Sequence, residues 1–283
     1  MKQNRKKLRL KKRVKRVVIL SFVFFIILMI NFNKLLLKLL TTYGNEKINS
    51  VFFDVSDDLV TYKTQNYRNS DYIFKVKEEK NTNPLVYLYN THQSEKYFKN
   101  DIFEPSIITA TNYLKEKLES NGIKTIMEKR SISEVLSKNG WSYGSSYRVS
   151  RSFLESTKNE YPSIEYYFDI HRDAGKKEQT TLCVNDKCYA KLLFLVGLEN
   201  PNYVITEEYA EKLSNMVNRR LNGLSKGIMQ KEGPKVNGVY NEDFSNRLIL
   251  IEIGGENNTI EEVYNTVDIL SSVIVDFIRE DDK

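Results

Sequence analysis

Histidine and cysteine are scarce in this chain: its 283 residues include two of each. The sequence also contains no P-loop and no H-E-x-x-H motif. A serine or cysteine triad would have to use one of the same two histidines, His92 or His171. For the same reason, a zinc site would have to complete its ligand set with a carboxylate or a thiolate.

Acidic residues are absent from the first sixteen positions, where ten residues are Lys or Arg, and charge of either sign is absent from residues 17–33. Seventeen helical residues span roughly 25 Å, and continuing to residue 40, with Lys34 and Lys38 reaching back to the interface, supplies the remaining length of a ~30 Å hydrocarbon core. No alanine precedes Ala110, so the small-residue cleavage site of a signal peptide is missing. We therefore expect a basic cytoplasmic tail at 1–16 and a single transmembrane anchor at 17–40, with everything after it outside the cell membrane.

The net charge of +6 belongs to that tail. Without its ten basic residues the chain has 33 Lys and Arg against 37 Asp and Glu, a net charge of about −4. The basic excess is thus a topology signal, and a nucleic-acid partner is not expected. Residues 41–80 are mixed and polar and predict an extracytoplasmic stalk, which leaves 81–283 for one domain.

The strands and helices expected over 81–283 alternate along the chain, and this order predicts an α/β fold with a largely parallel or mixed sheet flanked by helices. No internal repeat is present. The expected strands are 85–90, 123–127, 164–170, 227–231 and 247–255, with a hairpin over 180–184 and 188–196; the expected helices are 105–119, 131–137, 145–158, 207–221 and one that a capping box at Thr259 to Glu262 opens.

Each histidine follows a β-rich apolar run: His92 ends Leu85-Val-Tyr-Leu-Tyr-Asn-Thr-His, and His171 ends Ile164-Glu-Tyr-Tyr-Phe-Asp-Ile-His. Two histidines at the carboxyl ends of strands in an α/β sheet are typical of a metal or acid–base site. Glu95, three residues after His92, is the nearest third ligand, and Glu104 is the alternative. Asp169 could face the same ion or orient a ligand from behind it.

Glu252 interrupts the apolar strand Leu248-Ile-Leu-Ile-Glu-Ile253 and precedes Gly254-Gly255. A carboxylate in such a run must be paired or lie at the open end of the sheet. Its functional interpretation is a general base of raised pKa, with the glycines leaving room for substrate or a close backbone approach. Arg172, directly after His171, could hold a substrate carboxylate or an oxyanion.

Cys183 and Cys188 flank the expected hairpin turn. A disulfide outside the cell and a thiolate pair for zinc are both compatible with that spacing, although no histidine lies nearby to complete the second.

Four segments resemble the stage II sporulation protein P family: Asn90-Thr-His-Gln-Ser-Glu-Lys-Tyr97, Phe168-Asp-Ile-His-Arg-Asp-Ala174, Tyr240-Asn-Glu-Asp-Phe-Ser245 and Leu250-Ile-Glu-Ile-Gly-Gly-Glu-Asn-Asn-Thr259. The resemblance implies an anchored protein with a catalytic domain similar to zinc N-acetylmuramoyl-L-alanine amidases. It implies cleavage of peptidoglycan, at that amide and also at peptide cross-links, in the space facing the forespore septum during engulfment. It also implies two partners, the stage II sporulation proteins D and M.

By the same resemblance, His92 and His171 fall on Zn²⁺ ligands, Glu95 on the acid of the His-x-x-Glu motif and Glu252 on the catalytic glutamate. Family members commonly begin the first motif His-Thr-His, whereas Asn90 stands first here, which leaves His92 as the essential ligand of that motif. Two other interpretations keep the fold: a catalytically inactive wall-binding scaffold, and a metal hydrolase acting on another extracytoplasmic amide.

Overall fold

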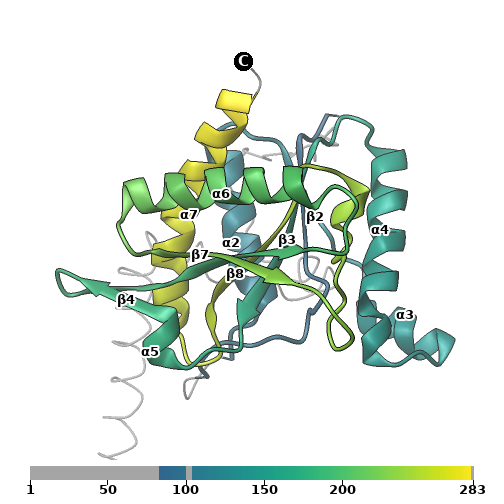
Figure 1. The fold of residues 1–283 in the computed structure, drawn as a ribbon, viewed down its shortest axis with the longest axis horizontal. Helices are drawn as coiled ribbons and strands as arrows, with labels where there is room; N and C mark the ends of the chain where they lie inside the picture. Colours follow the sequence, from purple (N-terminus) through teal and green to yellow (C-terminus); the bar gives the residue numbers. More distant parts are fainter. Residues whose placement is uncertain (1–82, 100–103, 282–283) are drawn as a thin grey trace, which may run out of the picture. The chain divides into compact units, whose positions relative to one another are not determined.

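A computed structural model describes residues 83–99 and 104–281 (Figure 1). The expected cytoplasmic tail, membrane anchor and stalk, at 1–16, 17–40 and 41–80, lie outside those residues. Within them, no helix combines the length and the apolar composition that a membrane span requires.

A six-stranded sheet forms the centre of the domain, in the order β2-β1-β3-β8-β6-β7. The strands β2, β1, β3 and β8 are parallel, β6 is antiparallel to β8, and β7 is parallel to β6. The prediction of a largely parallel or mixed sheet is confirmed. The strands are β1 (Val86–Tyr89), β2 (Thr125–Met127), β3 (Tyr166–Asp173), β6 (Leu192–Gly197), β7 (Ser225–Lys231) and β8 (Leu248–Gly255).

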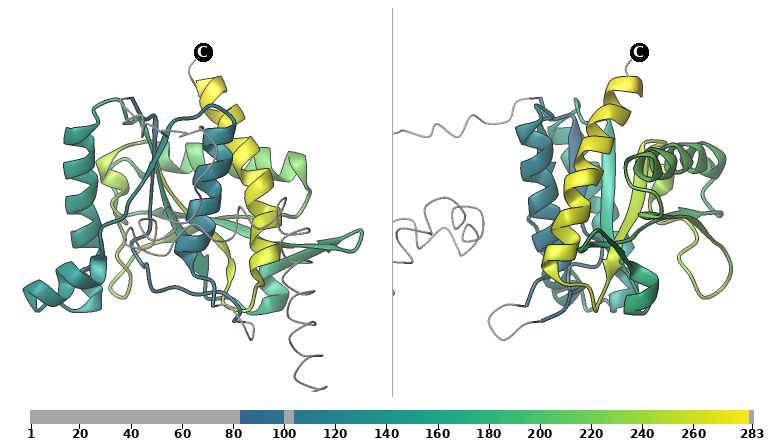
Figure 2. Two further views of the ribbon diagram at one scale, coloured as in Figure 1. Left: turned by 180° about the vertical axis from the view of Figure 1, so that it is seen from behind. Right: turned by 90° about the vertical axis from the view of Figure 1, so that its left-hand side faces the viewer.

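Helices cover both faces of this sheet because successive strand residues point to opposite sides. Phe168 and Ile170 of β3 belong to the main core, which also holds buried residues of three helices: α2 (Ile107–Ser120), α6 (Tyr203–Arg220) and α7 (Ile260–Asp281). Helices α2 and α7 run side by side (Figures 1 and 2).

Tyr167, the residue between those two on β3, points to the opposite face. There it packs with Leu154 of α4 (Ser146–Glu160), and α3 (Ile132–Asn139) packs on α4. This second face has fewer helices than the first, and its remaining cover is the loop around Tyr240, which contacts Leu195 and Leu250.

The predicted hairpin is wrong in one respect. The segment expected as one strand over 188–196 is two strands, β5 (Lys187–Ala190) and β6, because the chain leaves the hairpin after Ala190 and joins β8. The hairpin itself, β4 (Thr181–Val184) with β5, forms a separate two-stranded sheet. A short helix, α5 (Lys177–Thr180), precedes it.

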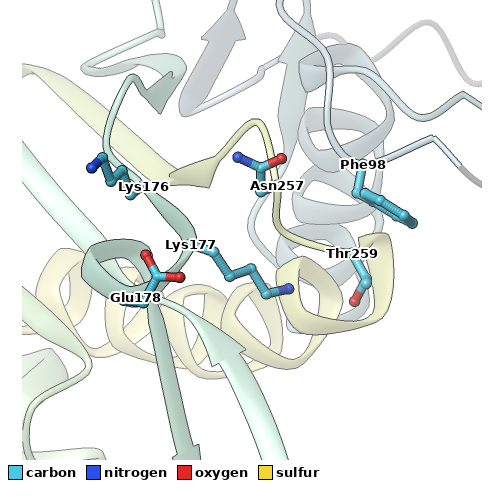
Figure 3. Close-up of a pocket in the computed structure, with 6 residues that line it drawn as sticks. All are labelled: Phe98, Lys176, Lys177, Glu178, Asn257 and Thr259. Atoms are coloured by element: carbon cyan, nitrogen blue, oxygen red, sulfur yellow. The ribbon is translucent and has the colours of Figure 1, made fainter.

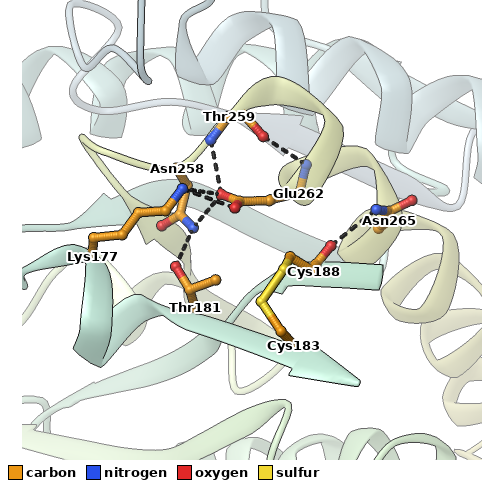
Figure 4. Close-up of a disulfide and its surroundings, with 8 residues drawn as sticks. All are labelled: Lys177, Thr181, Cys183, Cys188, Asn258, Thr259, Glu262 and Asn265. Carbon is orange, nitrogen blue, oxygen red and sulfur yellow. Dashed lines mark hydrogen bonds and ion pairs between the residues drawn. A yellow bond between two sulfur atoms is a disulfide. The ribbon is translucent and has the colours of Figure 1, made fainter. Parts of the chain in front are cut away.

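Cys183 and Cys188 face each other across the hairpin and form a disulfide, with their Cα atoms 4.0 Å apart (Figure 4). The disulfide that the spacing allowed is therefore present, and the alternative of a free thiolate pair for zinc is excluded. Asn265 of α7 donates a 2.9 Å hydrogen bond to the carbonyl oxygen of Cys188, so the hairpin is attached to the domain at its disulfide.

The predicted capping box at the start of α7 is confirmed. The backbone N–H of Thr259 donates to Oε2 of Glu262 over 2.9 Å, and the backbone N–H of Glu262 donates to Oγ1 of Thr259 over 3.3 Å. Lys177 and Asn258 also bond this carboxylate, which joins α5 to the start of α7 (Figure 4).

Gly254 should be intolerant of any side chain. Its φ is +60°, and an added Cβ would lie 2.7 Å from Cβ of Ala190 and 2.8 Å from Oδ1 of Asn258. Gly122, with φ +83° and no atom within 4 Å of the same position, is the matched control. We expect Gly122→Ala to lower the free energy of unfolding by about 1 kcal/mol from backbone strain alone, and Gly254→Ala to lower it by about 1–3 kcal/mol more because of overpacking. Urea unfolding of residues 41–283 measures both; equal losses would contradict the packing argument.

Candidate functional site

The two histidines and Glu252 meet where three adjacent parallel strands end. Strand β3 lies between β1 and β8, and His171 is in register with Glu252 on β8. His92 follows β1 in a turn. Because parallel strands end at the same edge of a sheet, residues far apart in the chain become neighbours there.

His92, Glu95 and His171, the three metal ligands proposed from the sequence, lie close together. The imidazole rings of His92 and His171 are perpendicular, with centres 5.2 Å apart. Oε2 of Glu95 lies 3.6 Å from Nδ1 of His171 and accepts a 3.0 Å hydrogen bond from the backbone N–H of Arg172. These contacts outweigh the effect of burial and lower the pKa of Glu95, so it is a carboxylate at neutral pH.

Asp169 lies behind His171, fully buried. Its Oδ1 is 3.0 Å from Nε2 of His171, off the direction of a well-aligned hydrogen bond. Thr91 donates to Asp169 from its backbone N–H over 2.9 Å and from its hydroxyl over 2.7 Å. Burial alone would lower the pKa of His171, but the carboxylates of Asp169 and Glu95 outweigh it and raise that pKa to about 10. The site therefore requires positive charge between these carboxylates.

Glu252 is a further acidic residue at the edge of the sheet where the parallel strands end. Burial raises its pKa to about 7, and the nearby carboxylate of Asp173 adds to the shift, while His171 opposes it. Lys226 pairs with Asp173. A carboxyl group of such a pKa can both take up and release a proton near neutral pH.

Arg172 lies at one wall of a cavity of about 450 Å³, together with Lys96 and Glu256. Its Nη2 is 3.9 Å from Oε2 of Glu256, and its buried Nε has no hydrogen-bond partner. A guanidinium that is only partly engaged at a cavity wall suits an anionic ligand group. A neighbouring cavity of about 530 Å³, lined by Phe98, Lys176, Lys177, Glu178, Asn257 and Thr259, contains none of the predicted site residues (Figure 3).

The structure places the two acids that the sequence offered as a third metal ligand, Glu95 and Glu104, in different surroundings. Glu104 is exposed and pairs with Lys96, whereas Glu95 faces His171. Asn90 is buried and has a structural position: its amide donates to the hydroxyl of Thr111 over 2.9 Å and to the carbonyl oxygen of Ile170 over 2.7 Å.

Three tyrosines beside the histidines, Tyr143, Tyr147 and Tyr240, form an aromatic wall that the sequence did not predict. Tyr143 stacks on His92 with ring centres 4.8 Å apart, and Tyr147 lies edge-on to His92 at 5.5 Å and parallel to His171 at 6.4 Å. Tyr240 lies edge-on to Tyr147 at 5.4 Å. Burial and the carboxylate of Asp169 raise the pKa of Tyr147 well above its usual value. The segment 240–245 was marked only by its family resemblance, and no pattern marked 143 and 147 on the chain.

The segment Gly140-Trp-Ser-Tyr-Gly144 has the G-x-S-x-G spacing of serine hydrolases. That motif acts from a sharp turn between a strand and a helix. Here it follows α3 and enters a 3₁₀ turn, η1 (Tyr143–Ser145), so the spacing lacks the required context.

Glu242 lies in a second 3₁₀ turn, η2 (Glu242–Phe244), and is fully buried. Its Oε2 accepts a 2.8 Å hydrogen bond from the backbone N–H of Gly197, and its Oε1 has no partner. Burial, with a contribution from Asp169, raises its pKa to about 8. The group is therefore a neutral carboxylic acid at pH 7.

Two imidazoles and a carboxylate form a donor set of catalytic zinc sites. The buried Nδ1 of His92 has no hydrogen-bond partner, and Nδ1 of His171 faces Glu95, so nitrogen atoms suited to a metal ion are available. Over 83–99 and 104–281, however, no three His, Cys, Asp or Glu side chains are arranged to enclose a metal ion. A bound ion would have to turn these three side chains toward a common point.

Two comparisons with known proteins, one with a sequence profile and one with a curated relative, indicate the same family. The sequence profile of stage II sporulation protein P (SpoIIP) matches residues 41–275. The stage II sporulation protein P of Bacillus subtilis (strain 168) is 31% identical over 209 residues, which are 70% of this chain and 52% of that protein, so the chain spans about half the length of this relative. Among solved structures, Cwp6 from Clostridium difficile superposes on 69% of this chain and 29% of its own, with a TM-score of 0.42 and 15% identity.

Glu242 should make stability depend on pH. The pKa of Glu242 is about 8 in the folded chain and near 4.5 in the unfolded chain. The stability that the protonated side chain gives to the fold is therefore fully present below pH 4.5. It is lost as the pH rises to 8, because the unfolded chain releases the proton first. We expect the melting temperature of Glu242→Gln to gain on that of the wild type between pH 5 and pH 8. Glu211→Gln, at an exposed position on α6, makes the same substitution on the surface and is the control. A constant difference for Glu242→Gln would contradict the raised pKa.

Proposed function

Because the chain belongs to the stage II sporulation protein P family, whose members are sporulation proteins linked to peptidoglycan hydrolysis, we propose that it is a zinc-dependent peptidoglycan hydrolase. Its substrate bond is the amide between the lactyl group of N-acetylmuramic acid and L-alanine, with peptide cross-links as a second target. The observation that carries the proposal is the convergence of His92, Glu95 and His171 beside Glu252 at adjacent strand ends.

His92, Glu95 and His171 would hold the zinc ion. When bound, zinc supplies a Lewis acid that lowers the pKa of a water molecule and polarises the scissile carbonyl. It would also meet the demand for positive charge that the carboxylates of Glu95 and Asp169 impose, which a proton on His171 otherwise meets. The contact of Asp169 with Nε2 would hold the ring so that Nδ1 faces Glu95.

Glu252 is the general base and acid. In its ionised form it takes a proton from the attacking water, and in its protonated form it gives that proton to the departing amine of L-alanine. Its pKa of about 7 keeps both steps accessible at neutral pH. Arg172 binds a carboxylate of the stem peptide from the cavity wall.

The cellular setting is part of the same proposal. Residues 17–40 anchor the protein in the cell membrane, with the domain in the space that faces the forespore septum. There it acts with the stage II sporulation proteins D and M during engulfment. The competing proposal is a wall-binding scaffold without catalytic activity, for which the carboxyl group of Glu252 would have no chemical task.

Digestion of peptidoglycan should distinguish the two proposals. We expect residues 41–283 to release new N-terminal L-alanine from purified peptidoglycan, and chelation to abolish the release because water would lose its activator. End-group analysis by mass spectrometry, with and without chelator and after restoring zinc, measures this. Peptidoglycan that is bound but left uncut would favour the scaffold, and cleavage that survives chelation would exclude the metal mechanism.

Zinc content should separate Glu95 from Glu104. We expect Glu95→Gln to lose tight zinc binding, because a ligand is removed, and Glu104→Gln to retain it, because that side chain faces Lys96. Metal analysis after dialysis measures both variants, and loss of zinc in Glu104→Gln alone would reverse the assignment.

Glu252→Gln should bind zinc normally and cleave on the order of 10²–10⁴-fold more slowly, since a general base is lost and no ligand is. The rate of L-alanine release, measured beside the zinc content of the same preparation, checks this. Normal cleavage by zinc-loaded Glu252→Gln would remove Glu252 as the base.

A further inference from the structure

Tyr147 is the aromatic side chain that contacts both histidines. Its ring lies edge-on to His92 and parallel to His171. It comes from the first turn of α4, on the face of the sheet that carries Asp169, His171 and Glu252. Any group held by the two imidazoles is therefore adjacent to this ring.

The backbone at Tyr147 is fastened to the same structure that positions the histidines. The amide of Asn241 donates to the carbonyl oxygen of Tyr147 over 3.1 Å and to Oγ of Ser150 over 3.0 Å. Oγ of Ser150 in turn lies within hydrogen-bond distance, 2.9 Å, of Oγ1 of Thr91, whose hydroxyl donates to Asp169. The start of α4 is thus tied to the carboxylate that contacts His171.

The hydroxyl of Tyr147 is left without a partner by this arrangement: across the described part of the chain, no hydrogen bond engages it. Several other tyrosines of the domain use theirs, whereas the hydroxyl of Tyr89, which is buried in the core, also has no partner. The hydroxyl of Tyr97 donates to the carbonyl oxygen of Ile253 over 2.9 Å, and that of Tyr167 donates to the carbonyl oxygen of Ile164 over 3.1 Å. A phenol held rigidly beside a reaction centre, with its donor unused, is available to a substrate oxygen.

We propose that the Tyr147 hydroxyl donates a hydrogen bond to the carbonyl oxygen of the scissile amide and stabilises the negative charge that develops there. The inference rests on the proposed hydrolase function and assigns a further catalytic residue to the same site. As water adds to the carbonyl carbon, the π-electron pair moves to the oxygen and the hydrogen bond from Tyr147 strengthens. When that pair returns and the C–N bond breaks, the amine leaves with the proton from Glu252, and Tyr147 keeps its own proton throughout.

The test compares Tyr147→Phe with Tyr203→Phe in the full chain, purified in detergent and loaded with zinc. Phenylalanine at 147 keeps the ring contacts with both histidines and loses only the donor. Tyr203 is exposed at the start of α6, so Tyr203→Phe removes a hydroxyl away from the site and is the matched control. We expect kcat for L-alanine release to fall on the order of 100-fold in Tyr147→Phe, with KM, zinc content and melting temperature unchanged, as for removal of one donor to an oxyanion. Tyr203→Phe should match the wild type.

A binding measurement supplies a second readout. A phosphonamidate analogue of the muramoyl-L-alanine bond imitates the tetrahedral arrangement of the transition state. Its affinity should fall by a similar factor in Tyr147→Phe, whereas the affinity of an uncleaved muropeptide, measured in a Glu252→Gln background, should not change.

Each other outcome is decisive. Wild-type rates in Tyr147→Phe, with a cleaving wild type, would overturn this inference and leave the proposed function standing. A loss of zinc or of melting temperature, or a raised KM with unchanged kcat, would show that the hydroxyl acts on structure or ground-state binding and would also overturn it. A wild-type protein that does not cleave would remove the proposed function, and the inference with it.

Discussion

The buried carboxylate of Asp169 is the constraint on which the rest of the site depends. A charge that is fully removed from water must be compensated where it lies, and Thr91 and His171 provide that compensation. Leaving such a group without its partners costs about 3–5 kcal/mol, a large part of the stability of an ordinary domain. The contacts of Asp169 therefore hold the ends of β1 and β3 in one arrangement, and the two histidines follow.

Charge balance explains why this edge of the sheet suits a cation. Burial would lower the pKa of His171, but Asp169 and Glu95 lie against its imidazole and raise that pKa to about 10. A divalent ion would satisfy the same carboxylates and displace that proton. The environment that favours a protonated histidine in the absence of a metal is the environment that attracts the metal.

The two faces of the sheet differ: one carries the main hydrophobic core, and the other carries the residues of the candidate site. One face is covered by α2, α6 and α7 and forms the main core. The other carries α3, α4 and the loop around Tyr240. His171 is buried on this second face, and Glu242, in the loop around Tyr240, is fully buried with a raised pKa.

The sequence by itself indicated most of the strands and helices, and it marked the residues near strand ends that the structure brings together. The apolar runs that lead to His92 and His171, and the single acid in the run before Gly254, carried enough information because parallel strands end at the same edge of a sheet. The capping box at Thr259 was readable for a similar reason, since both of its bonds are local.

Only the tertiary structure decided what depends on contacts between distant segments. It placed Glu95 beside His171 and Glu104 beside Lys96. It also brought α4 and its Tyr147 against both histidines, and split the expected strand over 188–196 so that β6 could pair with β8. Helical periodicity states which residues share a face but not which strand end that face will meet. The aromatic wall was therefore invisible in the chain and appears only in the packed domain.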